Sequence, residues 1–340
     1  MSKKILLSGV KPTGRPHIGN YFGAMKQFVD MQEDYNCMFF LADYHALNFI
    51  QDGKELSQSI IDLATDYLAI GLDPQKSVIY KQSDIPEHTE LAWIFDTITT
   101  CAYLERSHAY KDAQAKGKEV SVGTFNYPML MAADILMYDA DVVPVGQDQK
   151  QHVEYARDTA EKFNRIFKSE VFKLPEAKIL EEVAIVPGID GRKMSKSYGN
   201  TIPLFATREE ITKAVMSIVT DSFIKNISDG KAVIDQEVVY KINDERQHRP
   251  QNLYAIHRLF KNEKELNSFY DNKLGNYKEI KESLIEDVDA FIKPLRDKRE
   301  HLASDTDFVL DTLKEGGKRA KQKAEHKMSA VREAIGVKLY

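Results

Sequence analysis

The chain has 340 residues, of which 43% are apolar and 29% are charged, proportions that are typical of a globular protein and exclude a disordered one. This length exceeds one typical hydrophobic core, so we expect two domains. The formal net charge of -5 excludes a global attraction to nucleic acid, so any nucleic-acid binding must use a local basic patch.

The sequence shows no strong membrane, disulfide or metal signal. No apolar run approaches the length that spans a bilayer, and the first apolar residues, 5–7, pass directly into a short strand. We therefore expect no membrane association and a cytoplasmic location. Cys37 and Cys101 are too few for a thiolate zinc site, so we also expect no protein-bound structural metal.

The first predicted unit is a strand, a loop and a helix. Residues 5–9 predict a short buried strand, residues 11–16 a turn-rich loop, and an apolar period near 3.6 over residues 21–31 a helix. At the carboxyl end of a parallel strand such a loop faces a ligand crevice, and the start of the helix supplies free amides for phosphate. The unit is therefore typical of a nucleotide site.

Polar groups at the start of this helix suit a phosphate ligand. Gly19 lets the backbone approach closely, while His17 and Asn20 can donate hydrogen bonds to phosphate oxygens. Without further support, a histidine that merely caps the helix is the preferred interpretation of His17.

Alternating strands and helices follow. Residues 37–43 predict a second, nearly continuous apolar strand, residues 60–68 an amphipathic helix that ends at Gly71, and residues 77–80 a third strand. Strands that are covered on both faces read as continuous apolar runs. The order therefore predicts a doubly wound α/β domain with a parallel sheet.

Residues 85–139 predict helices, interrupted by a polar stretch at residues 111–119 that is a solvated loop or a contact for phosphate. Tyr127, Met131 and Asp134 are four and three positions apart, so they share one helix face. A carboxylate in such an apolar run is costly to bury without a partner. Asp134 either accepts from a donor in the core or is the acceptor at the end of a flat apolar slot.

Two more strands are predicted. Residues 141–146 form a fourth strand that runs into a polar helix start, where Asp148 caps the helix or accepts from ribose hydroxyls. Residues 183–186 form a fifth strand. It leads into residues 193–197, with the sequence Lys-Met-Ser-Lys-Ser, where two lysines between glycine turns suit a polyphosphate. Taken alone, this stretch is equally well a solvated basic turn.

Beyond residue 202 the strand signals stop. Apolar stripes at residues 211–218, 253–260 and 280–295 predict a helical second domain. The last helix has a local basic face that is merely solvated or can hold a phosphate backbone. Its basic residues are Lys318, Arg319, Lys321, Lys323, Lys327 and Arg332.

The two loop motifs together resemble those of the class I aminoacyl-tRNA synthetases. Pro-His-Ile-Gly-Asn at residues 16–20 follows the first strand, and residues 193–197, here called the lysine loop, follow the fifth. Within that class the chain is similar to the tryptophanyl-tRNA synthetase family over nearly its full length, whereas the tyrosyl family shares the sheet and the lysine loop but not the whole set. The other matching segments are residues 8–14, 131–136, 143–152 and 219–222.

The resemblance implies a Rossmann-like catalytic domain over residues 1–203, with a helical insertion at about residues 85–139, and a helical anticodon-binding domain over residues 204–340. It also implies a homodimer formed through the insertion helices. In the implied reaction, ATP with Mg²⁺ activates L-tryptophan to the adenylate, releasing pyrophosphate, and tryptophan then passes to the 3′ end of tRNA(Trp). No protein nucleophile is needed, because the protein aligns the two anions and neutralises the phosphates.

The resemblance also implies roles for individual residues. His17, Lys193 and Lys196 would stabilise the phosphoryl transition state. ATP would contact Lys11, Pro12, Thr13, Gly19, Asn20, Gly146, Gln147, Asp148, Gln149, Val186, Lys193, Met194, Ser195, Lys196 and Ser197. Asp134 would accept from the indole nitrogen, which only donates, in a slot shaped by Tyr127, Met131, Val143 and Val145.

Two departures from the family pattern bear on ATP contacts: Lys11 stands where many members have glutamine, and Gln147 where many have glutamate. Three other functions are to be weighed. The first is a tyrosine-specific synthetase, the second a small nucleotidyltransferase, and the third a synthetase-like regulator that binds tryptophan or RNA without charging tRNA. Amino-acid-dependent exchange of pyrophosphate into ATP separates them.

Overall fold

The computed structural model describes residues 3–115, 117, 119–145, 150–179, 186–218, 226–228, 231–234, 237–241, 251–273 and 276–340. Three of the predicted features therefore lie wholly or mainly outside the described residues. They are residues 146–149, 183–185 and 219–222.

The first part of the chain alternates strands and helices. Its strands are β1 (Ile5–Val10), β2 (Asn36–Leu41), β3 (Ser77–Lys81), β4 (Val142–Val145) and β5 (Glu176–Ile179). Its helices are α1 (Ile18–Asn20), η1 (Tyr21–Met25), α2 (Lys26–Met31), α3 (Asp43–Ala46), α4 (Gly53–Ile70), η2 (Gln82–Asp84), α5 (Glu87–Ile98), α6 (Cys101–Leu104), α7 (His108–Ala115), α8 (Val122–Leu136) and α9 (Lys150–Ile166).

The remainder of the chain is mostly helical. Its elements are η4 (Lys196–Tyr198), α10 (Arg208–Met216), β6 (Asn226–Ser228), β7 (Lys231–Ile234), β8 (Glu237–Lys241), α11 (Gln251–His257), α12 (Glu263–Asn272), α13 (Tyr277–Ser304) and α14 (Thr306–Ala334).

Five parallel strands form the central sheet in the order β3-β2-β1-β4-β5, which confirms the predicted doubly wound α/β fold. The chain winds from β1 through β2 to β3 and then returns to the other side of β1 for β4 and β5. The winding therefore reverses between β1 and β4. Ligands of such sheets bind outside the carboxyl ends of the strands at this reversal.

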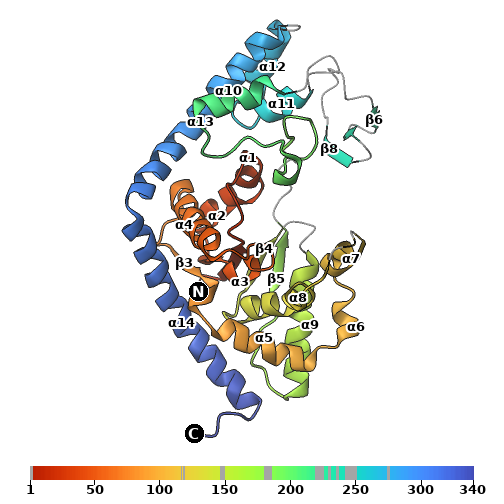
Figure 1. Ribbon diagram of the computed structural model, residues 1–340, viewed down its shortest axis with the longest axis vertical. Helices are drawn as coiled ribbons and strands as arrows, with labels where there is room; N and C mark the ends of the chain where they lie inside the picture. The colour runs from red at the N-terminus through yellow and green to blue at the C-terminus, as the bar shows by residue number, and fades with distance from the viewer. Residues whose placement is uncertain are drawn as a thin grey trace.

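Successive strand residues enter two different cores. Leu6 packs on the side of α2 and α4, while Leu7 packs on the side of α5, α8 and α9. Helices lie on both faces of the strands in Figure 1. This explains the almost continuous apolar runs of β1 and β2, because neither face of a doubly covered parallel sheet meets water.

Helices α5, α6, α7 and α8 lie between β3 and β4, in the stretch where the sequence predicts helices. The polar stretch at residues 111–119 is corrected in part. Its first five residues continue α7 to Ala115 and are not a loop. Alanine, lysine and glutamine are strong helix formers, so local propensity outweighs the polar composition there.

The outer strand of the sheet was not predicted at its true position. The strand beside β4 is β5, at Glu176–Ile179, whereas residues 183–185 of the predicted fifth strand lie outside the described residues. Of that stretch the structure describes Val186, which is buried but does not belong to a strand. The sequence of β5 alternates charged and apolar residues, as an edge strand does. It therefore lacks the continuous apolar run that predicts the other strands.

The second region also holds an element that was not predicted. Besides the expected helices, it contains an antiparallel sheet in the order β6-β7-β8. These strands have three to five residues each.

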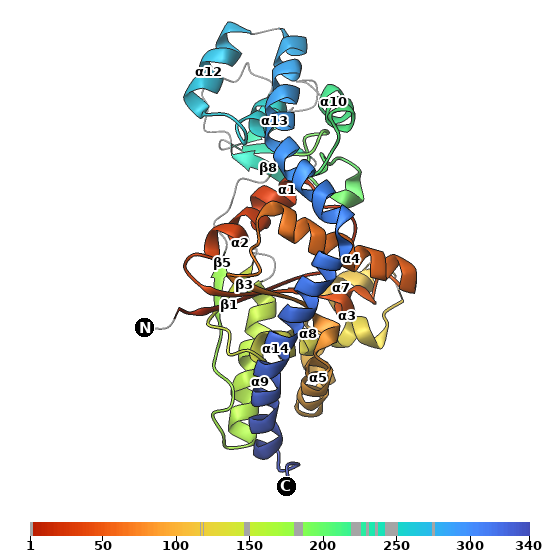
Figure 2. The ribbon, with the colours of Figure 1, turned by 90° about the vertical axis from the view of Figure 1, so that its left-hand side faces the viewer.

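Helices α13 and α14 follow one another along one side of the molecule (Figures 1 and 2). Helix α13 packs against α4, α10 and α11, whereas α14 packs against β3, α4 and α5. Gly316 permits this close approach, because a Cβ there would lie 1.8 Å from the carbonyl oxygen of Ile79. The last helix is therefore docked on the central sheet.

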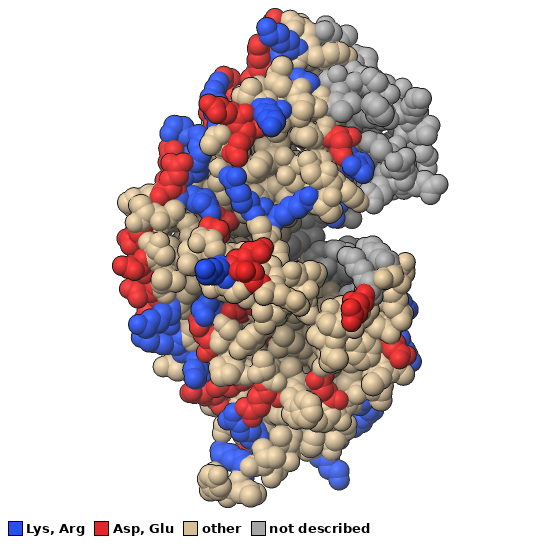
Figure 3. Space-filling view, in the orientation of Figure 1, with Lys and Arg blue, Asp and Glu red and all other residues tan. Residues whose placement is uncertain are grey.

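Several basic residues of α14 are used within the chain. Lys327 is buried and pairs with Asp139, and Arg332 pairs with Glu90. Arg319 donates to backbone carbonyl oxygens at the start of β3. Acidic and basic side chains alternate along this edge in Figure 3. Partners within the chain therefore take up the charges of these three residues, which does not favour their use as a basic face for nucleic acid.

Candidate functional site

A cavity of about 530 Å³ lies at the carboxyl ends of β1 and β2, beside the reversal of winding. Its walls come from the strand ends, α3, α8, α9 and the loop after β1. The lining residues are Gly9, Lys11, Phe40, Ala42, His45, Asn48, Phe49, Asp112, Thr124, Tyr127, Met131, Asp134, Gln151 and His152. At Gly9 a Cβ would lie 2.2 Å from the ring of Phe40, so glycine leaves room for that ring in the wall.

The predicted face of α8 lines this cavity. Tyr127, Met131 and Asp134 all contribute to its wall, which confirms that they lie on one side of the helix. The hydroxyl of Tyr127 lies 3.2 Å from Nε2 of His152 on α9. The cavity is thus lined by an aromatic ring, a thioether and a carboxylate.

Asp134 is fully buried and accepts hydrogen bonds from three side chains. Gln82 Nε2 lies 2.7 Å from Oδ1 and 2.9 Å from Oδ2. His88 Nδ1 lies 2.6 Å from Oδ1, and His45 Nε2 lies 3.0 Å from Oδ2. Asp134 therefore accepts from donors in the core, and it also borders the cavity.

These donors decide the charge of Asp134. Burial alone would raise its pKa, but the hydrogen bonds from His45 and His88 outweigh it and lower the pKa to about 2. The group is therefore an ionised carboxylate at neutral pH. An ionised carboxylate only accepts hydrogen bonds, so this end of the cavity selects a donor.

The helix start after β1 shows the capping arrangement. Nδ1 of His17 accepts from the backbone N–H of Asn20 at 3.2 Å, and Oδ1 of Asn20 accepts from the backbone N–H of His17 at 3.1 Å. Burial and the charge of Lys196 lower the pKa of His17 to about 4. The imidazole is therefore neutral at neutral pH, with Nε2 left as its second polar atom.

The lysine loop folds against the loop after β1. Nζ of Lys196 donates to the carbonyl oxygens of Thr13 at 2.5 Å and Gly14 at 2.9 Å. A Cβ on Gly19 would contact the side chain of Met194, which is buried. The two segments that are predicted to suit phosphate are thus neighbours, although 183 positions separate Thr13 from Lys196.

Asn200 organises the lysine loop from within. Its Oδ1 accepts from the backbone N–H of Ser195, and its Nδ2 donates to Asp190 and to the carbonyl oxygen of Lys193. The hydroxyls of Ser195 and Ser197 lie 2.9 Å apart. The sequence did not predict this role of Asn200, because its partners lie five to ten positions away in an irregular loop and follow no repeat.

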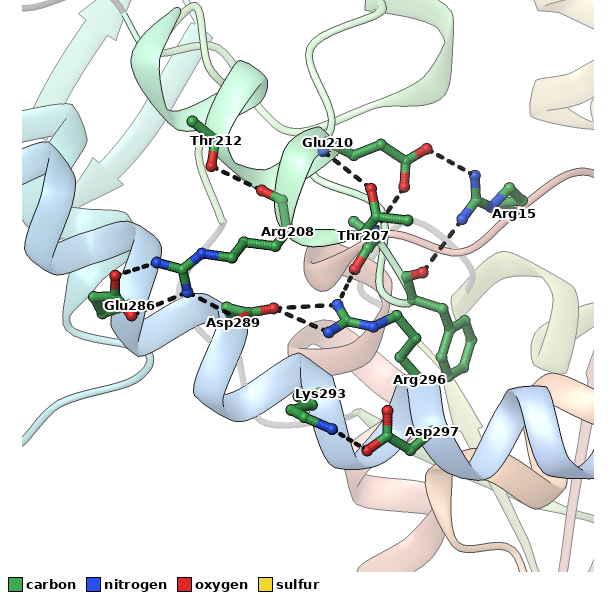
Figure 4. Close-up of polar contacts among 12 residues, drawn as sticks. Arg15, Thr207, Arg208, Glu210, Thr212, Glu286, Asp289, Lys293, Arg296 and Asp297 are labelled. Atoms are coloured by element: carbon green, nitrogen blue, oxygen red, sulfur yellow. Dashed lines mark hydrogen bonds and ion pairs between the residues drawn. The ribbon is translucent and has the colours of Figure 1, made fainter.

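The segment after the lysine loop is fixed to α13 and to the loop after β1 (Figure 4). Arg296 on α13 donates to the carbonyl oxygen of Ala206 and to Asp289. Arg15, in the loop after β1, donates to Glu210 on α10 at 3.3 Å. These contacts connect the candidate nucleotide loops to the helical region.

Some predicted site residues lie elsewhere. Val143 is buried in the core beneath the sheet, and Val145 packs against that core; neither borders the cavity. Val186 accepts from the backbone N–H of Met194 through its carbonyl oxygen. The predicted ribose contacts, Gly146, Gln147, Asp148 and Gln149, lie outside the described residues.

Sequence reasoning missed the partners of Asp134. His45 follows β2, while Gln82 and His88 follow β3. A usable signal existed, because a carboxylate in an apolar helix needs donors. Polar residues just after the ends of neighbouring parallel strands are the natural candidates for such donors.

The described part of the chain shows neither a membrane-spanning helix nor a cluster of metal ligands. None of its helices is long and apolar enough to cross a membrane. No group of three or more His, Cys, Asp or Glu side chains there could hold a metal ion.

Comparisons with known proteins identify the relatives of the chain. The model of the family described as tRNA synthetases class I (W and Y) matches residues 2–293. The tryptophan–tRNA ligase of Fusobacterium nucleatum is 47% identical over 334 residues, 97% of each chain. That of Rhodopirellula baltica is 44% identical, covering 98% of this chain and 99% of the relative.

Solved structures give the same result. Tryptophanyl-tRNA synthetase from Campylobacter jejuni, complexed with ADP and tryptophan, superposes with a TM-score of 0.86 at 43% identity, covering 98% of this chain and 99% of the other. The enzyme from Mycoplasma pneumoniae has a TM-score of 0.78 at 28% identity, covering 98% of both chains.

Proposed function

The chain belongs to the class I tRNA synthetases for tryptophan and tyrosine, and we infer that its function is tryptophan–tRNA ligation. It activates L-tryptophan with ATP to tryptophanyl-adenylate and pyrophosphate, and then transfers tryptophan to the 3′ end of tRNA(Trp). One observation of the site carries this choice of substrate. The ionised Asp134 closes a cavity walled by Tyr127 and Met131.

We propose that the indole ring of tryptophan lies in this cavity with its N–H toward Asp134. Tyr127 and Met131 would contact the ring, since an aromatic edge and a polarisable thioether suit a flat apolar ligand. Val143 and Val145 would act indirectly, by supporting the sheet beneath. A tyrosine ring also carries a donor, so the shape of the cavity would contribute to its rejection.

We propose that ATP binds between the loop after β1 and the lysine loop. Lys193, Lys196 and His17 would face the phosphates, with Lys11 at the cavity entrance, where its ammonium lies 4.5 Å from the centre of the Phe49 ring. In-line attack of the tryptophan carboxylate on the α-phosphate needs positive charge on the departing pyrophosphate. Lysines on a loop that can close would supply this charge.

The remaining ATP contacts are proposed by family resemblance. Backbone or side-chain groups of the two loops and of the stretch after β4 would hold the nucleotide. They are Pro12, Thr13, Gly19, Asn20, Gly146, Gln147, Asp148, Gln149, Val186, Met194, Ser195 and Ser197. ATP would enter as its magnesium complex, with the ion on phosphate oxygens.

We propose that the part of the chain beyond residue 203 recognises the anticodon of tRNA(Trp). The helices α10 to α13 and the small sheet stand beyond the central sheet in Figure 1, whereas α14 is docked on it. Single-stranded anticodon bases are recognised by stacking and by hydrogen bonds to their edges. The cytoplasm is the proposed location, since charged tRNA is consumed there.

A homodimer formed through the insertion helices is also proposed. Trp93 on α5 and Val122 on α8 are large apolar residues with 69% and 79% of their surface exposed. Large exposed apolar residues of this kind suit an interface between two copies. Light scattering after gel filtration should give twice the mass of one chain, and a monomer at working concentration contradicts the dimer.

Aminoacylation tests the function as a whole. The chain, incubated with ATP, magnesium, labelled tryptophan and a tRNA(Trp) transcript, should place tryptophan on the 3′ end. A transcript with an altered anticodon serves as the control for the second domain. Failure to charge the cognate transcript, with adenylate formation intact, contradicts the transfer step.

A further inference from the structure

A second layer of buried side chains lies behind Asp134. His88 is completely buried on α5, and its two ring nitrogens have different partners. Nδ1 lies 2.6 Å from Oδ1 of Asp134, and Nε2 lies 2.8 Å from the hydroxyl of Tyr138. The function inferred above assigns no role to either His88 or Tyr138.

These contacts fix the position of the imidazole proton. A carboxylate can only accept, so Nδ1 of His88 must carry the hydrogen that points to Asp134. Burial raises the pKa of Tyr138, so its hydroxyl keeps its proton and can donate to Nε2. Tyr138 thus holds His88 in the tautomer that donates to the carboxylate, as outer partners of ligating histidines do elsewhere.

The three donors to Asp134 are not equivalent. His45 borders the cavity and contacts Oδ2, so a ligand N–H at Oδ2 would share or replace that contact. Gln82 and His88 do not border the cavity, and both are completely buried. They would remain bound to Asp134 when a ligand arrives.

We propose that His88, held by Tyr138, is a positioning residue for substrate selection, because its hydrogen bond keeps the carboxylate of Asp134 turned toward the cavity. The slot then favours an aromatic ring that carries an N–H donor over a ring of the same shape without one. This inference rests on the proposed placement of tryptophan. The physical basis is that a ligand ring without an N–H leaves the buried carboxylate one hydrogen bond short. This unsatisfied acceptor lowers the affinity for that ligand.

A matched pair of variants tests the proposal. Asparagine and leucine have nearly the same shape, but the asparagine amide nitrogen lies where Nδ1 of histidine lies. His88→Asn therefore keeps a donor for Asp134, and His88→Leu removes it. Calorimetry would give Kd for tryptophan and for β-(3-benzothienyl)alanine, in which sulfur replaces the indole N–H. Kd for ATP in each variant reports whether the nucleotide site is intact.

The natural chain should bind tryptophan about 10-fold to about 100-fold more tightly than the sulfur analogue, the range for a hydrogen bond to a charged group. His88→Leu should lose most of this preference, His88→Asn should keep most of it, and ATP affinity should stay the same. Equal preferences in the natural chain and in His88→Leu overturn the proposal. An equal loss in both variants also overturns it, because the donor would then be irrelevant.

Two further outcomes are informative. If the natural chain itself binds both ligands equally, the placement of the indole on Asp134 fails, and the role of His88 fails with it. If the natural chain prefers tryptophan over the sulfur analogue and His88→Leu shows the same preference, only the role of His88 fails. Should His88→Leu not fold, Tyr138→Phe preserves the packing and should reduce the preference by about 2-fold to about 10-fold. An unchanged preference in that variant overturns the proposal.

Discussion

The ammonium group of Lys196 donates to the carbonyl oxygen of Thr13 at 2.5 Å and so joins the two loops proposed to hold ATP. These loops contact each other through this ammonium, and burial lowers the pKa of Lys196. Binding of ATP must therefore exchange backbone carbonyls for phosphate oxygens around this ammonium. The contact makes Lys196 the group whose removal should affect the chemical step most clearly.

Lys196→Ala should reduce the rate of adenylate formation by about 10² to about 10³, the scale for one lost transition-state contact. The KM for tryptophan should change little, because Lys196 does not border the cavity. Pyrophosphate exchange with varied ATP and tryptophan measures both. Lys298→Ala, an exposed lysine on α13, is the control, and a similar loss in that variant would refute the role of Lys196.

Asp134→Ala should weaken tryptophan binding by about 10-fold to about 100-fold while leaving ATP binding almost unchanged. The reason is that the carboxylate is the acceptor at the end of the cavity and lies away from the lysine loop. The variant should also lose about 3 kcal/mol of unfolding free energy, since buried donors are left without their partner. Equal losses for the two substrates, measured by calorimetry, would disprove the assignment.

His17 should make the stability of the chain sensitive to mild acid. Its pKa is 6.5 in the unfolded chain and about 4 in the folded one, so between these values the unfolded chain binds more protons. The contribution of His17 is therefore fully present above about pH 6.5 and is lost as the pH falls toward 4.

His17→Asn supplies the comparison, because asparagine can still cap the helix but does not titrate. Denaturant unfolding of both proteins at about pH 7 and about pH 5 should show the steeper loss of unfolding free energy in the natural chain. Parallel losses would mean that His17 keeps its ordinary pKa in the fold.

Gly316→Ala should destabilise the chain by several kcal/mol, in the range that backbone clashes and overpacking reach. The added Cβ would lie 1.8 Å from the carbonyl oxygen of Ile79, and α14 would have to move off β3. Gly23→Ala is the matched control, because a Cβ there meets nothing within 4 Å. Thermal unfolding of both variants checks this, and equal melting temperatures would contradict the docking of α14.

The sequence was informative where one physical constraint dominates. Leu6 and Leu7 are both apolar because each enters a different core. A sheet that is covered on both faces can therefore be predicted from continuous apolar runs in the sequence. Tyr127, Met131 and Asp134 follow from helical spacing alone. Predictions of this kind need only a local repeat.

Contacts that follow no local repeat could not be predicted from the sequence. His88 reaches Asp134 across 46 positions, and Asn200 acts through backbone groups of its own loop. The sequence did not predict the partners of the basic residues of α14, because a charged side chain gives no local signal of the group with which it pairs. Lys327 is buried beside Asp139, 188 positions away, so only the fold could assign it.

The most direct test of the account is pyrophosphate exchange into ATP, measured with each of the twenty amino acids in turn. The account predicts that L-tryptophan alone supports rapid exchange and that tyrosine does so poorly, because Asp134 and the shape of its cavity fit an indole. Exchange supported best by tyrosine, or by no amino acid at all, would contradict it.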